Sequence, residues 1–571
     1  MSAAAGEPLP EAAAGDGAGG AVADAGEAYG NTWFTASGSH AQPRPPLTQD
    51  IDVDVCVIGG GLAGLSAAVE VARRGWSVAV LERQRVAWNA SSRNAGFVRP
   101  GFDQTTPALI ERVGPDHARE VWMLSQDGLE QVRRHARDMR DVVQGDGFLR
   151  VSKTDRASAV SDEAEILRGL GADIEFWPAE LVRSKLKSPF YFQAIHFPTA
   201  FCIDPYRYAL GLAGLAEAAG ARIFETTAAI SIDPAGVRKR IVTPQGRVRA
   251  GHIVFAGNVH LGPIMPGVAD TLIPLHAFAI VTKPLGERLA QAVDYRGAVS
   301  DTDFADHHYR IVGGDRLMFA GRIAAREASP QRYARKLRRD LHRRFPQLAP
   351  AEIDYAWGGT VGVTMHRMPQ IGEVAPGVWL SSGFGGQGIN ISAMAAMLIA
   401  GAMIDGDDRY RLFEPFELVW AGGRLGPFVA KGLYQAQRLY EQWASRRAHK
   451  NEVWQIANAP RLKKEAEEAA ERARIRAEEA AIAEAARIER EKIEAEQSAL
   501  RRIERERVAA EKAEAKRIRK EEKAAAKAEA ARLKEQQRAA ARAEKERVAA
   551  EQAEAKRFEA EQRAAEKAQA E

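Results

Sequence analysis

The sequence predicts an α/β protein in which a Rossmann-like dinucleotide-binding domain is interleaved with an α+β substrate domain and followed by a long, charged C-terminal α-helix. Three observations predict this fold class. A β-branched strand, a glycine-rich turn and a helical segment follow one another between residues 51 and 75. Short apolar strands that end in glycine return far downstream, at 252–258 and before the loop at 381–390. After Pro460 the chain contains neither glycine nor proline.

The composition disfavours several classes of protein. The chain has 571 residues, enough for two or three domains. The formal net charge is +4, from 80 basic and 76 acidic residues, so the basic excess typical of nucleic-acid binding is missing and we expect no nucleic-acid partner. The two cysteines, Cys56 and Cys202, do not form a C-x-x-C pair, which favours a reducing, cytoplasmic setting.

The N-terminal segment 1–30 is rich in alanine, glycine and acidic residues, and we expect it to be disordered. It lacks a basic n-region and an apolar h-region, so we do not interpret it as a secretory signal. Residues 31–50 contain Trp33, Phe34 and the stretch QPRPP, and we expect an extended arm on the domain surface. The apolar run 393–404 is too short to span a bilayer, so we expect no membrane span.

The first globular element is a βαβ unit made of VDVCVIGG, LAGLSAAVEVARRG and WSVAVLER. Its turn carries Gly59, Gly61 and Gly64 in the spacing G-x-G-x-x-G, which allows a tight turn, close approach of a pyrophosphate, and close packing of helix on strand. Glu82 ends the second strand, where it can accept hydrogen bonds from both ribose hydroxyls of an adenosine. Arg83 follows, but an acid at the strand tip disfavours the 2′-phosphate of NADP. The unit predicts a dinucleotide site; a glycine-rich turn beside an exposed glutamate is the alternative.

Two later segments favour a flavin over a nicotinamide. The stretch WNASSRNAGFVRPG (88–101) stands where a nicotinamide enzyme usually has another plain βαβ turn, and its small, polar residues can wrap a pyrophosphate and a ribityl chain. The loop SSGFGGQGIN (381–390) precedes a helix whose free N–H groups favour negative charge, such as that of a reduced flavin. Singly, each segment has an alternative as a polar or flexible loop; together and in this order they predict FAD.

The remaining elements follow in order along the chain. Residues 211–232 predict another helix–glycine–strand unit, 270–330 several strands separated by turns, and 357–405 a strand, a glycine-rich loop and a helix. The FAD-binding parts are therefore expected at about 51–110, 200–270 and 355–405. The segments between them would form the substrate domain, all within residues 51–447.

The C-terminal segment 461–571 consists mainly of Ala, Glu, Lys, Arg and Gln, all strong helix formers. The stretch ERERVAAEKAEAKR (504–517) returns as EKERVAAEQAEAKR (544–557). Leu, Ile and Val do not sustain a heptad, so we expect a single charged helix or a weak coiled coil, about 165 Å long if straight. Self-association or docking through this helix and a solvated extension without a partner both stay open.

With these motifs the chain resembles the DAO superfamily of FAD-dependent oxidoreductases, which includes glycine oxidase and D-amino-acid oxidase. The resemblance covers about residues 30–445 and rests on DVCVIGGGLAGLSAAVEVARRG, SSRNAGF, HIVFAGN, YAWGGTVGVTMHRMPQIG and GFGGQGIN. It implies a small amine or amino-acid substrate, a gamma-glutamylated polyamine among the candidates, bound over the flavin. It also implies hydride transfer from an amine C–H to flavin N5, hydrolysis of the imine, and reoxidation by O2 with release of H2O2 or by another electron acceptor.

The resemblance assigns roles to the motif residues. It implies that the ADP part of the cofactor contacts Gly59, Gly61, Gly64 and Glu82, with Arg83 beside them. It implies that the pyrophosphate and the flavin lie along Ser92, Arg93, Asn94 and Gly96. Near the pyrimidine edge of the flavin it implies Gly385, Gly386, Gln387 and Gly388. Neither cysteine suits covalent attachment, so we expect non-covalent FAD, and we predict no metal site.

The substrate side is predicted from the chemistry of amine oxidation. A hydride leaves an amine only when the nitrogen lone pair is free, so the site needs a base or an apolar surround that lowers the pKa of the amine. The candidate catalytic residues are His308, Arg310, Arg322, Trp357 and His366. His308 and Arg310 would share one face of a strand, and Arg310 or Arg322 would clamp a substrate carboxylate. Trp357 would line the site and His366 would lie in a loop near the flavin; core, surface or salt-bridge roles are the alternatives.

Three functions stay open at this point. The first is an FAD enzyme that oxidises an amine or amino acid. The second is a nicotinamide dehydrogenase, which a flavin absorption band would exclude. The third is a non-enzymatic or regulatory flavoprotein module on a helical rod, which reduction of the bound flavin by an amine would disfavour.

Overall fold

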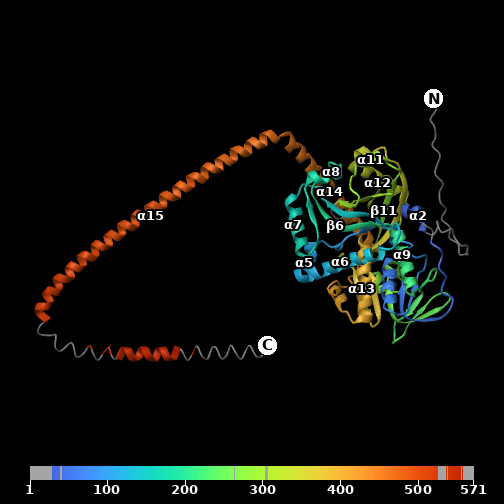
Figure 1. Cartoon of the computed structure of the whole chain (residues 1–571), viewed down its shortest axis with the longest axis horizontal. Helices are drawn as coiled ribbons and strands as arrows, with labels where there is room; N and C mark the ends of the chain where they lie inside the picture. Colours follow the sequence, from blue (N-terminus) through green and yellow to red (C-terminus); the bar gives the residue numbers. More distant parts are fainter. Residues whose placement is uncertain are drawn as a thin grey trace. The chain divides into compact units, whose positions relative to one another are not determined.

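The computed structural model describes residues 29–38, 41–262, 264–301, 307–524, 535, 538–539, 541–553 and 556. The chain divides into two compact units, Met1–Trp454 and Gln455–Glu571. Figure 1 shows sheets covered by helices in the first unit and a long helical ribbon in the second. Apart from Tyr29 and Gly30, the segment for which we expect disorder lies outside the described residues.

The first sheet has eight strands, and its centre is parallel, in the order β17–β10–β1–β2–β7. Strands far apart in the sequence pair directly, as Val55 of β1 does with both Val78 and His252. The strands are β1 (Ile51–Ile58), β2 (Val78–Leu81), β7 (Arg222–Phe224), β8 (Ser231–Asp233), β9 (Lys239–Val242), β10 (Arg247–Phe255), β16 (Gln370–Ala375) and β17 (Val378–Ser382). This pairing confirms the interleaved α/β fold class that the sequence predicts.

Helices cover this sheet and make the main core. Helix α13 (Gly388–Ala400) packs against α3 (Leu62–Arg73) and α6 (Pro115–Ala136), and α3 also packs against α9 (Pro205–Ala218). The stretch Gly388–Asp405 is long and apolar enough to cross a membrane, but 67% of it is buried inside the fold. Its apolar residues therefore serve the core between α3 and α6.

The second sheet has nine strands, in the order β15–β11–β14–β13–β12–β4–β6–β3, with β5 beside β6. Side chains alternate between its two faces. On one face Leu149, Val299 and Tyr309 pack against Leu337 and Leu341 of α12 (Pro330–Arg344). Elsewhere on the sheet, Val312 and Met318 pack against Phe34, whereas Ser300 and His308 line a cavity. The strands are β3 (Phe97–Val98), β4 (Val143–Val151), β5 (Glu175–Trp177), β6 (Ala194–Ile203), β11 (Ile273–Thr282), β12 (Ala298–Asp301), β13 (His307–Val312), β14 (Arg316–Ala324) and β15 (Ile353–Val363).

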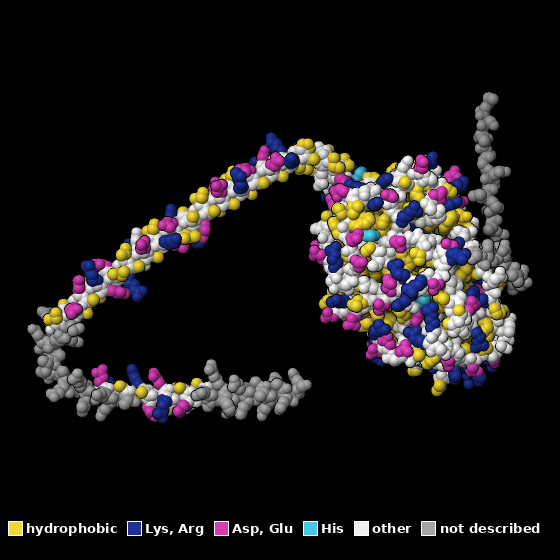
Figure 2. All heavy atoms as spheres, in the orientation of Figure 1, with side chains coloured by type: hydrophobic (Ala, Val, Ile, Leu, Met, Phe, Trp, Pro, Cys, Tyr) yellow, Lys and Arg dark blue, Asp and Glu magenta, His cyan; other side chains and the backbone are white. Residues whose placement is uncertain are grey.

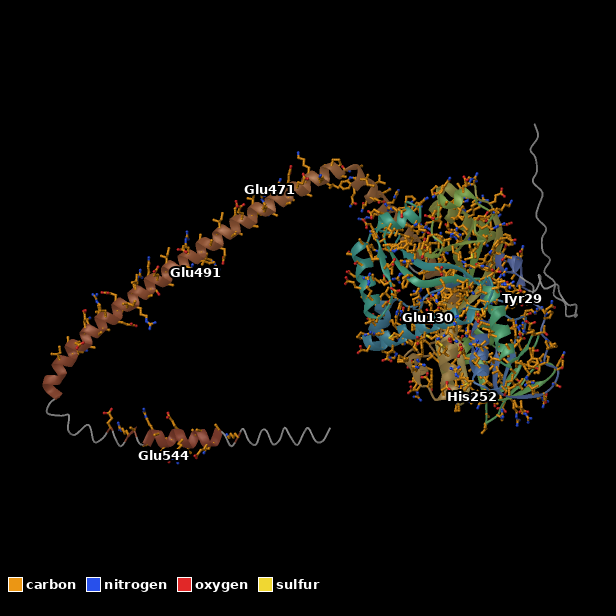
Figure 3. The ribbon with its side chains drawn as sticks, viewed as in Figure 1. Tyr29, Glu130, His252, Glu471, Glu491 and Glu544 are labelled. Carbon is orange, nitrogen blue, oxygen red and sulfur yellow. The ribbon has the colours of Figure 1, made fainter. Side chains whose placement is uncertain are left out.

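The expected extended arm 31–50 differs from the structure at its start. Thr32 and Thr35 form a capping box, so Trp33–Ser37 make the short helix α2. Phe34 is fully buried and packs with Tyr29 and Tyr206 (Figure 3 labels Tyr29). The arm is therefore part of the core here, because its aromatic side chains fill a gap beside α9.

The remaining described helices complete the first unit. They are α4 (Ala90–Arg93), α5 (Thr106–Val113), α7 (Ala157–Gly169), α8 (Ala179–Lys185), α10 (Pro266–Ala269), α11 (Glu287–Ala290) and α14 (Gly426–Ala457). Helix α14 continues across the boundary between the units by three residues.

The second unit is helical wherever it is described beyond Asn458. Helix α15 (Ala459–Ala524) carries i,i+4 ion pairs such as Arg461–Glu465 and Arg502–Glu506, and its described side chains other than Leu462 are exposed. Figure 3 shows Glu471 and Glu491 projecting from it. This matches the single charged helix, whereas the coiled coil stays a prediction. Beyond residue 553, apart from Lys556, the expected helix lies outside the described residues.

Candidate active site

A cavity of about 1520 Å³ lies in the first unit and is lined by residues from both sheets. The carboxyl ends of β1, β2 and β10 contribute Gly59, Glu82 and Gly257. Ligands of parallel α/β sheets bind at this edge, where helix N-termini point toward the site. The second sheet supplies the opposite wall, including His308 and Arg322.

The glycines of the first turn are there for steric reasons. Gly59 has a φ of +114°, and a Cβ on it would lie 2.8 Å from the carbonyl carbon of Ala256. A Cβ on Gly64 would overlap the carbonyl oxygen of Gly59. Gly61, at the start of α3, has no side chain to cap the helix, and the N–H of Leu62 donates to Ser91 Oγ at 3.0 Å. Gly59 and Gly61 line the cavity, whereas Gly64 does not and instead permits the contact of helix with strand.

Glu82 stabilises the same turn and faces the cavity. Its Oε2 accepts the N–H of Gly60 at 2.7 Å, and its Oε1 accepts the N–H of Gln84 at 2.8 Å. Burial raises the pKa of this carboxyl, and the two backbone donors oppose that rise. Arg83 also lines the cavity.

The segment 88–101 folds around α4 at the edge of the cavity. Arg93 donates to the carbonyl oxygens of Gly358 and Tyr29, and Asn94 Oδ1 accepts the N–H of Gly96 at 2.8 Å. Arg93, Asn94 and Gly96 line the cavity, but Ser92 is fully buried outside its lining. Ser92 was expected to lie along the cofactor, but its side chain does not line the cavity, because its position on α4 directs it toward the core.

The loop before α13 meets an acidic residue that the sequence motifs did not reveal. The N–H of Gly386 donates to Asp103 Oδ2 at 2.8 Å, and a side chain on Gly385 would collide with the same carboxylate. Gln387 lines the cavity, and its buried amide nitrogen and oxygen have no hydrogen-bond partner within the described part of the chain. Gly385, Gly386, Gln387 and Gly388 all lie in the cavity lining. Asp103 follows the 88–101 segment without any motif of its own, so its position was not predictable.

His308 and Arg322 stand on the wall that the second sheet contributes. His308 Nδ1 and Ser300 Oγ are 2.8 Å apart, on the neighbouring strands β13 and β12. Arg322 Nε and Nη2 donate to the two carboxylate oxygens of Asp340 at 2.6 and 2.9 Å. The backbone of Arg322 has a φ of +56°, a region that non-glycine residues rarely adopt, so the fold holds this side chain in place against strain.

Three predicted catalytic residues do not line the cavity. Arg310 shares the strand face of His308, as expected, but it is only 1% exposed. Its guanidinium donates to the carbonyl oxygen of Ile203 at 2.7 Å and lies over the ring of Phe34. Trp357 is buried and donates from Nε1 to the carbonyl oxygen of Arg93. Both belong to the packing around α2 and α4, which the sequence pattern did not reveal.

His366 is the third residue outside the cavity lining. Its Nδ1 accepts the N–H of Met368 at 3.1 Å, so its Nε2–H donates to the carbonyl oxygen of Glu417 at 3.1 Å. Burial lowers the pKa of this imidazole. With both ring nitrogens engaged, His366 connects two loops and does not face the site.

Arginines dominate the charged lining of the cavity. Among the described residues that line it, seven are arginines and three are carboxylates. Sequence reasoning missed Arg99, Arg150, Arg156 and Arg367, as well as the partner of Arg150, Glu163, at 2.7 Å. These residues carry no motif, and only the pairing of β4 with β12 brings Arg150 level with Ser300 and His308.

A family model described as FAD dependent oxidoreductase (DAO) matches residues 54–402. The chain is 30% identical over 413 residues to gamma-glutamylputrescine oxidoreductase of Escherichia coli, covering 70% of this chain and 96% of that protein. It is 28% identical over 393 residues to the probable oxidoreductase OrdL of Haemophilus influenzae, covering 67% of this chain and 90% of the relative.

Solved structures share the fold of the first unit. L-proline dehydrogenase from P. horikoshii matches with a TM-score of 0.55 and 19% identity, over 66% of this chain and 100% of that one. Glycine oxidase from Geobacillus kaustophilus matches with a TM-score of 0.54 and 19% identity, over 64% of this chain and 98% of that one. At this level of identity the likeness is one of fold.

Proposed function

The chain belongs to the DAO family of FAD-dependent oxidoreductases, and from that premise we propose that it oxidises a small amine or amino acid that carries a carboxylate. The observation that carries this proposal is the joint occurrence, in one cavity, of the dinucleotide turn and of His308 and Arg322 on the facing sheet. The excess of arginine over carboxylate in the lining supports an anionic group on the substrate rather than a simple polycation.

The residues present fit FAD as the cofactor. A Cβ on Gly59 would collide with the backbone of Ala256, and one on Gly61 would lie 2.8 Å from Ser91 Oγ, so the turn at the cavity edge requires glycine at both positions. The side-chain amide of Gln387 is buried without a partner among the described residues. We propose that Gly59, Gly61 and Glu82 hold the adenosine diphosphate part, non-covalently, and that the loop at Gly385–Gly388 meets the flavin ring. When bound, FAD supplies the acceptor for a hydride from the carbon beside the amine nitrogen.

His308 is the group that we propose to hold the amine neutral. We assign this role to Nε2 of His308, which would accept a proton from the substrate ammonium in the tautomer whose Nδ1–H donates to Ser300 Oγ. Removal of this proton frees the nitrogen lone pair, which the oxidation requires. Ser300 would then act as a positioning residue that fixes the tautomer.

Arg322 is the group that we propose to bind the carboxylate. Its guanidinium has a planar set of donors suited to a carboxylate, and its ion pair with Asp340 fixes the orientation of that plane. A gamma-glutamylated amine fits this proposal, because the glutamyl group carries a carboxylate remote from the amine that is oxidised. Hydrolysis of the imine and reoxidation by O2 with release of H2O2 would complete the turnover.

A panel of amines tests this function. The purified holoprotein is mixed anaerobically with polyamines, gamma-glutamylated polyamines, N-methyl amino acids and D-amino acids, and the loss of flavin absorbance is recorded. We expect rapid bleaching with a carboxylate-bearing amine and slow or no bleaching with the free polyamine. Bleaching by none of them would contradict the proposal and favour a non-enzymatic module.

A further inference from the structure

Helix α14 is packed on the first unit with polar residues on its buried side. Tyr434, Arg438, Glu441 and Ser445 are all 3–7% exposed and follow one another at spacings of three or four residues, so they form one helical face. Packed surface helices normally bury their apolar stripe instead.

Two ion pairs fix this orientation of α14. Arg438 Nη2 lies 2.8 Å from Asp340 Oδ1 on α12, and Lys153 Nζ lies 2.7 Å from Glu441 Oε2 (Figure 1 labels both helices). Rotation of the helix to bury the opposite face would break both pairs and remove one ion-pair partner each from the buried side chains of Asp340 and Lys153, which is unfavourable. The apolar face therefore stays outward.

The outward face of α14 is apolar and aromatic over five turns. Its members recur at helical spacing within a single arc, and they are between 44% and 72% exposed. We call them the α14 stripe: Leu425, which directly precedes the helix, and Phe428, Val429, Leu433, Leu439, Tyr440 and Trp443 within it. Trp420, which precedes the helix, is 68% exposed. A contiguous set of this kind, unlike single exposed apolar residues, marks an interaction site.

Most of the exposed charges around the α14 stripe are basic, whereas the exposed Glu417 precedes Trp420 and the exposed Glu327 follows Arg326. Between residues 418 and 451 the ionised side chains that are not buried are all basic: Arg424, Lys431, Arg446, Arg447 and Lys450. The acidic residue of this range, Glu441, is buried in its pair with Lys153. Guanidinium groups also lie over aromatic rings of the stripe, Arg447 over Trp443 and Arg326 over Phe428.

Helix α12 extends the basic surface. Arg332, Arg335, Arg338 and Arg339 are exposed on it, and its acidic residue Asp340 is buried. The pKa of the Lys336 ammonium is lowered by burial and then by the nearby positive charges of Arg332, Arg322 and Lys431. Because Lys336 is on α12 and Lys431 is on α14, the basic side chains of the two helices are close enough to repel one another. Figure 2 shows hydrophobic and basic side chains intermixed on the visible face of this unit.

From this surface we propose that α14 docks the first unit onto an anionic lipid bilayer, with the α14 stripe in the boundary between headgroups and acyl chains. Aromatic side chains favour this boundary, and flanking Lys and Arg attract anionic headgroups. A second copy is disfavoured because two such faces would oppose their basic side chains.

Docking would bring the cavity to the membrane surface. Leu425, Val429 and Leu433 of the stripe, together with Trp420, belong to the cavity lining as well as to the exposed surface. The mouth that they form would open onto the bilayer. This inference does not depend on the proposed substrate.

Vesicle flotation of the full-length holoprotein tests the docking. We expect the protein to float with vesicles of phosphatidylcholine and phosphatidylglycerol, and to stay in solution with phosphatidylcholine alone or at high salt. The triple variant Phe428→Ser, Leu439→Ser, Trp443→Ser removes stripe residues that do not line the cavity, and its partition should fall by about tenfold or more. Retained flavin and retained amine oxidation in solution would show that this variant is folded.

The matched control replaces exposed apolar residues elsewhere in the same unit. Met123 and Val237 are 50% and 88% exposed and do not line the cavity, and Met123→Ser, Val237→Ser should float like the wild type. Equal partition of the triple variant and the control would overturn the proposal. So would absence of flotation with anionic vesicles, or a dimer in light scattering that the triple variant dissociates without any vesicle binding.

Discussion

Arg322 and Asp340 form a two-point ion pair at the wall of the cavity, with Nε to Oδ2 at 2.6 Å and Nη2 to Oδ1 at 2.9 Å. Asp340 is 4% exposed and also accepts a hydrogen bond from Arg438. The pKa of this carboxyl is held well below its usual range: burial acts to raise it, and His307, Arg322 and Arg438 more than offset that effect. Asp340 is therefore an anchor for Arg322, which keeps donor capacity for a second carboxylate.

Replacement of Arg322 tests the carboxylate clamp. Arg322→Met should raise KM for a carboxylate-bearing amine by about 10- to 100-fold, from the loss of a charge-assisted contact of about 1.5–3 kcal/mol. KM for the corresponding carboxamide should change little. Arg335→Met, on the exposed side of α12, is the control and should leave both values unchanged. Equal loss with the carboxylate and the carboxamide would contradict the clamp.

Replacement of His308 tests the proposed base. His308→Asn should lower the anaerobic rate of flavin reduction by about 10²- to 10⁴-fold, the range typical of general bases, with FAD still bound. Ser300→Ala keeps the imidazole but removes its 2.8 Å contact, so we expect a smaller loss. A rate of reduction in His308→Asn close to that of the wild type would exclude His308 as the base.

Gly64 tests the packing beneath the dinucleotide turn. A Cβ at this position would overlap the carbonyl oxygen of Gly59, so Gly64→Ala must move α3 away from β1. We expect the Kd for FAD to rise by about tenfold or more and Tm to fall, although Gly64 does not line the cavity. Gly214→Ala on α9 meets no atom within 4 Å and is the matched control. Unchanged FAD affinity in Gly64→Ala would show that the contact is not required.

The ionised carboxylate of Glu70 on α3 stabilises the fold, and this stabilisation is lost at acid pH. Burial by itself raises the pKa of this carboxyl, but His135 and Arg74 lower it to about 2 in the folded protein. Because the folded pKa lies below the unfolded value of about 4.3, Glu70 stabilises the fold above that value, and the contribution, up to about 3 kcal/mol, is lost as pH falls from 4.3 toward 2.

Thermal unfolding between pH 6 and pH 3 measures this effect. Glu70→Gln should have a lower Tm at pH 6 and a smaller further fall toward pH 3 than the wild type. Glu130→Gln replaces an exposed carboxylate on α6, labelled in Figure 3, and should follow the wild-type curve. Parallel curves for wild type and Glu70→Gln would contradict the assignment.

The nucleotide half of the site was predictable because its requirements are local. The strand, the turn and the helix around Gly59 lie within about 25 residues, and each glycine has a steric reason that a motif records. The loop at Gly385–Gly388 was predictable for the same reason, since the helix begins directly after it.

The substrate half was less predictable because its side chains are assembled from separate strands. Strand alternation gave the shared face of His308 and Arg310, but not the burial of Arg310 beneath Phe34, which comes from the N-terminal arm. Arg150 becomes a neighbour of Ser300 only through the pairing of β4 with β12. Likewise, the hydrogen bond from Gly386 to Asp103 joins residues 283 positions apart, and no motif in either segment predicts it.

The order of strands in the first sheet has a consequence for biosynthesis. Strand β10 pairs with β1 on one side and with β17 on the other, so a nascent chain that has not reached Val378 lacks one neighbour of β10. Helix α13, which packs on α3 beside the dinucleotide turn, follows later still. Most of the first unit therefore emerges from the ribosome before its nucleotide site is complete, and we expect cofactor capture to wait until β17 and α13 have been synthesised.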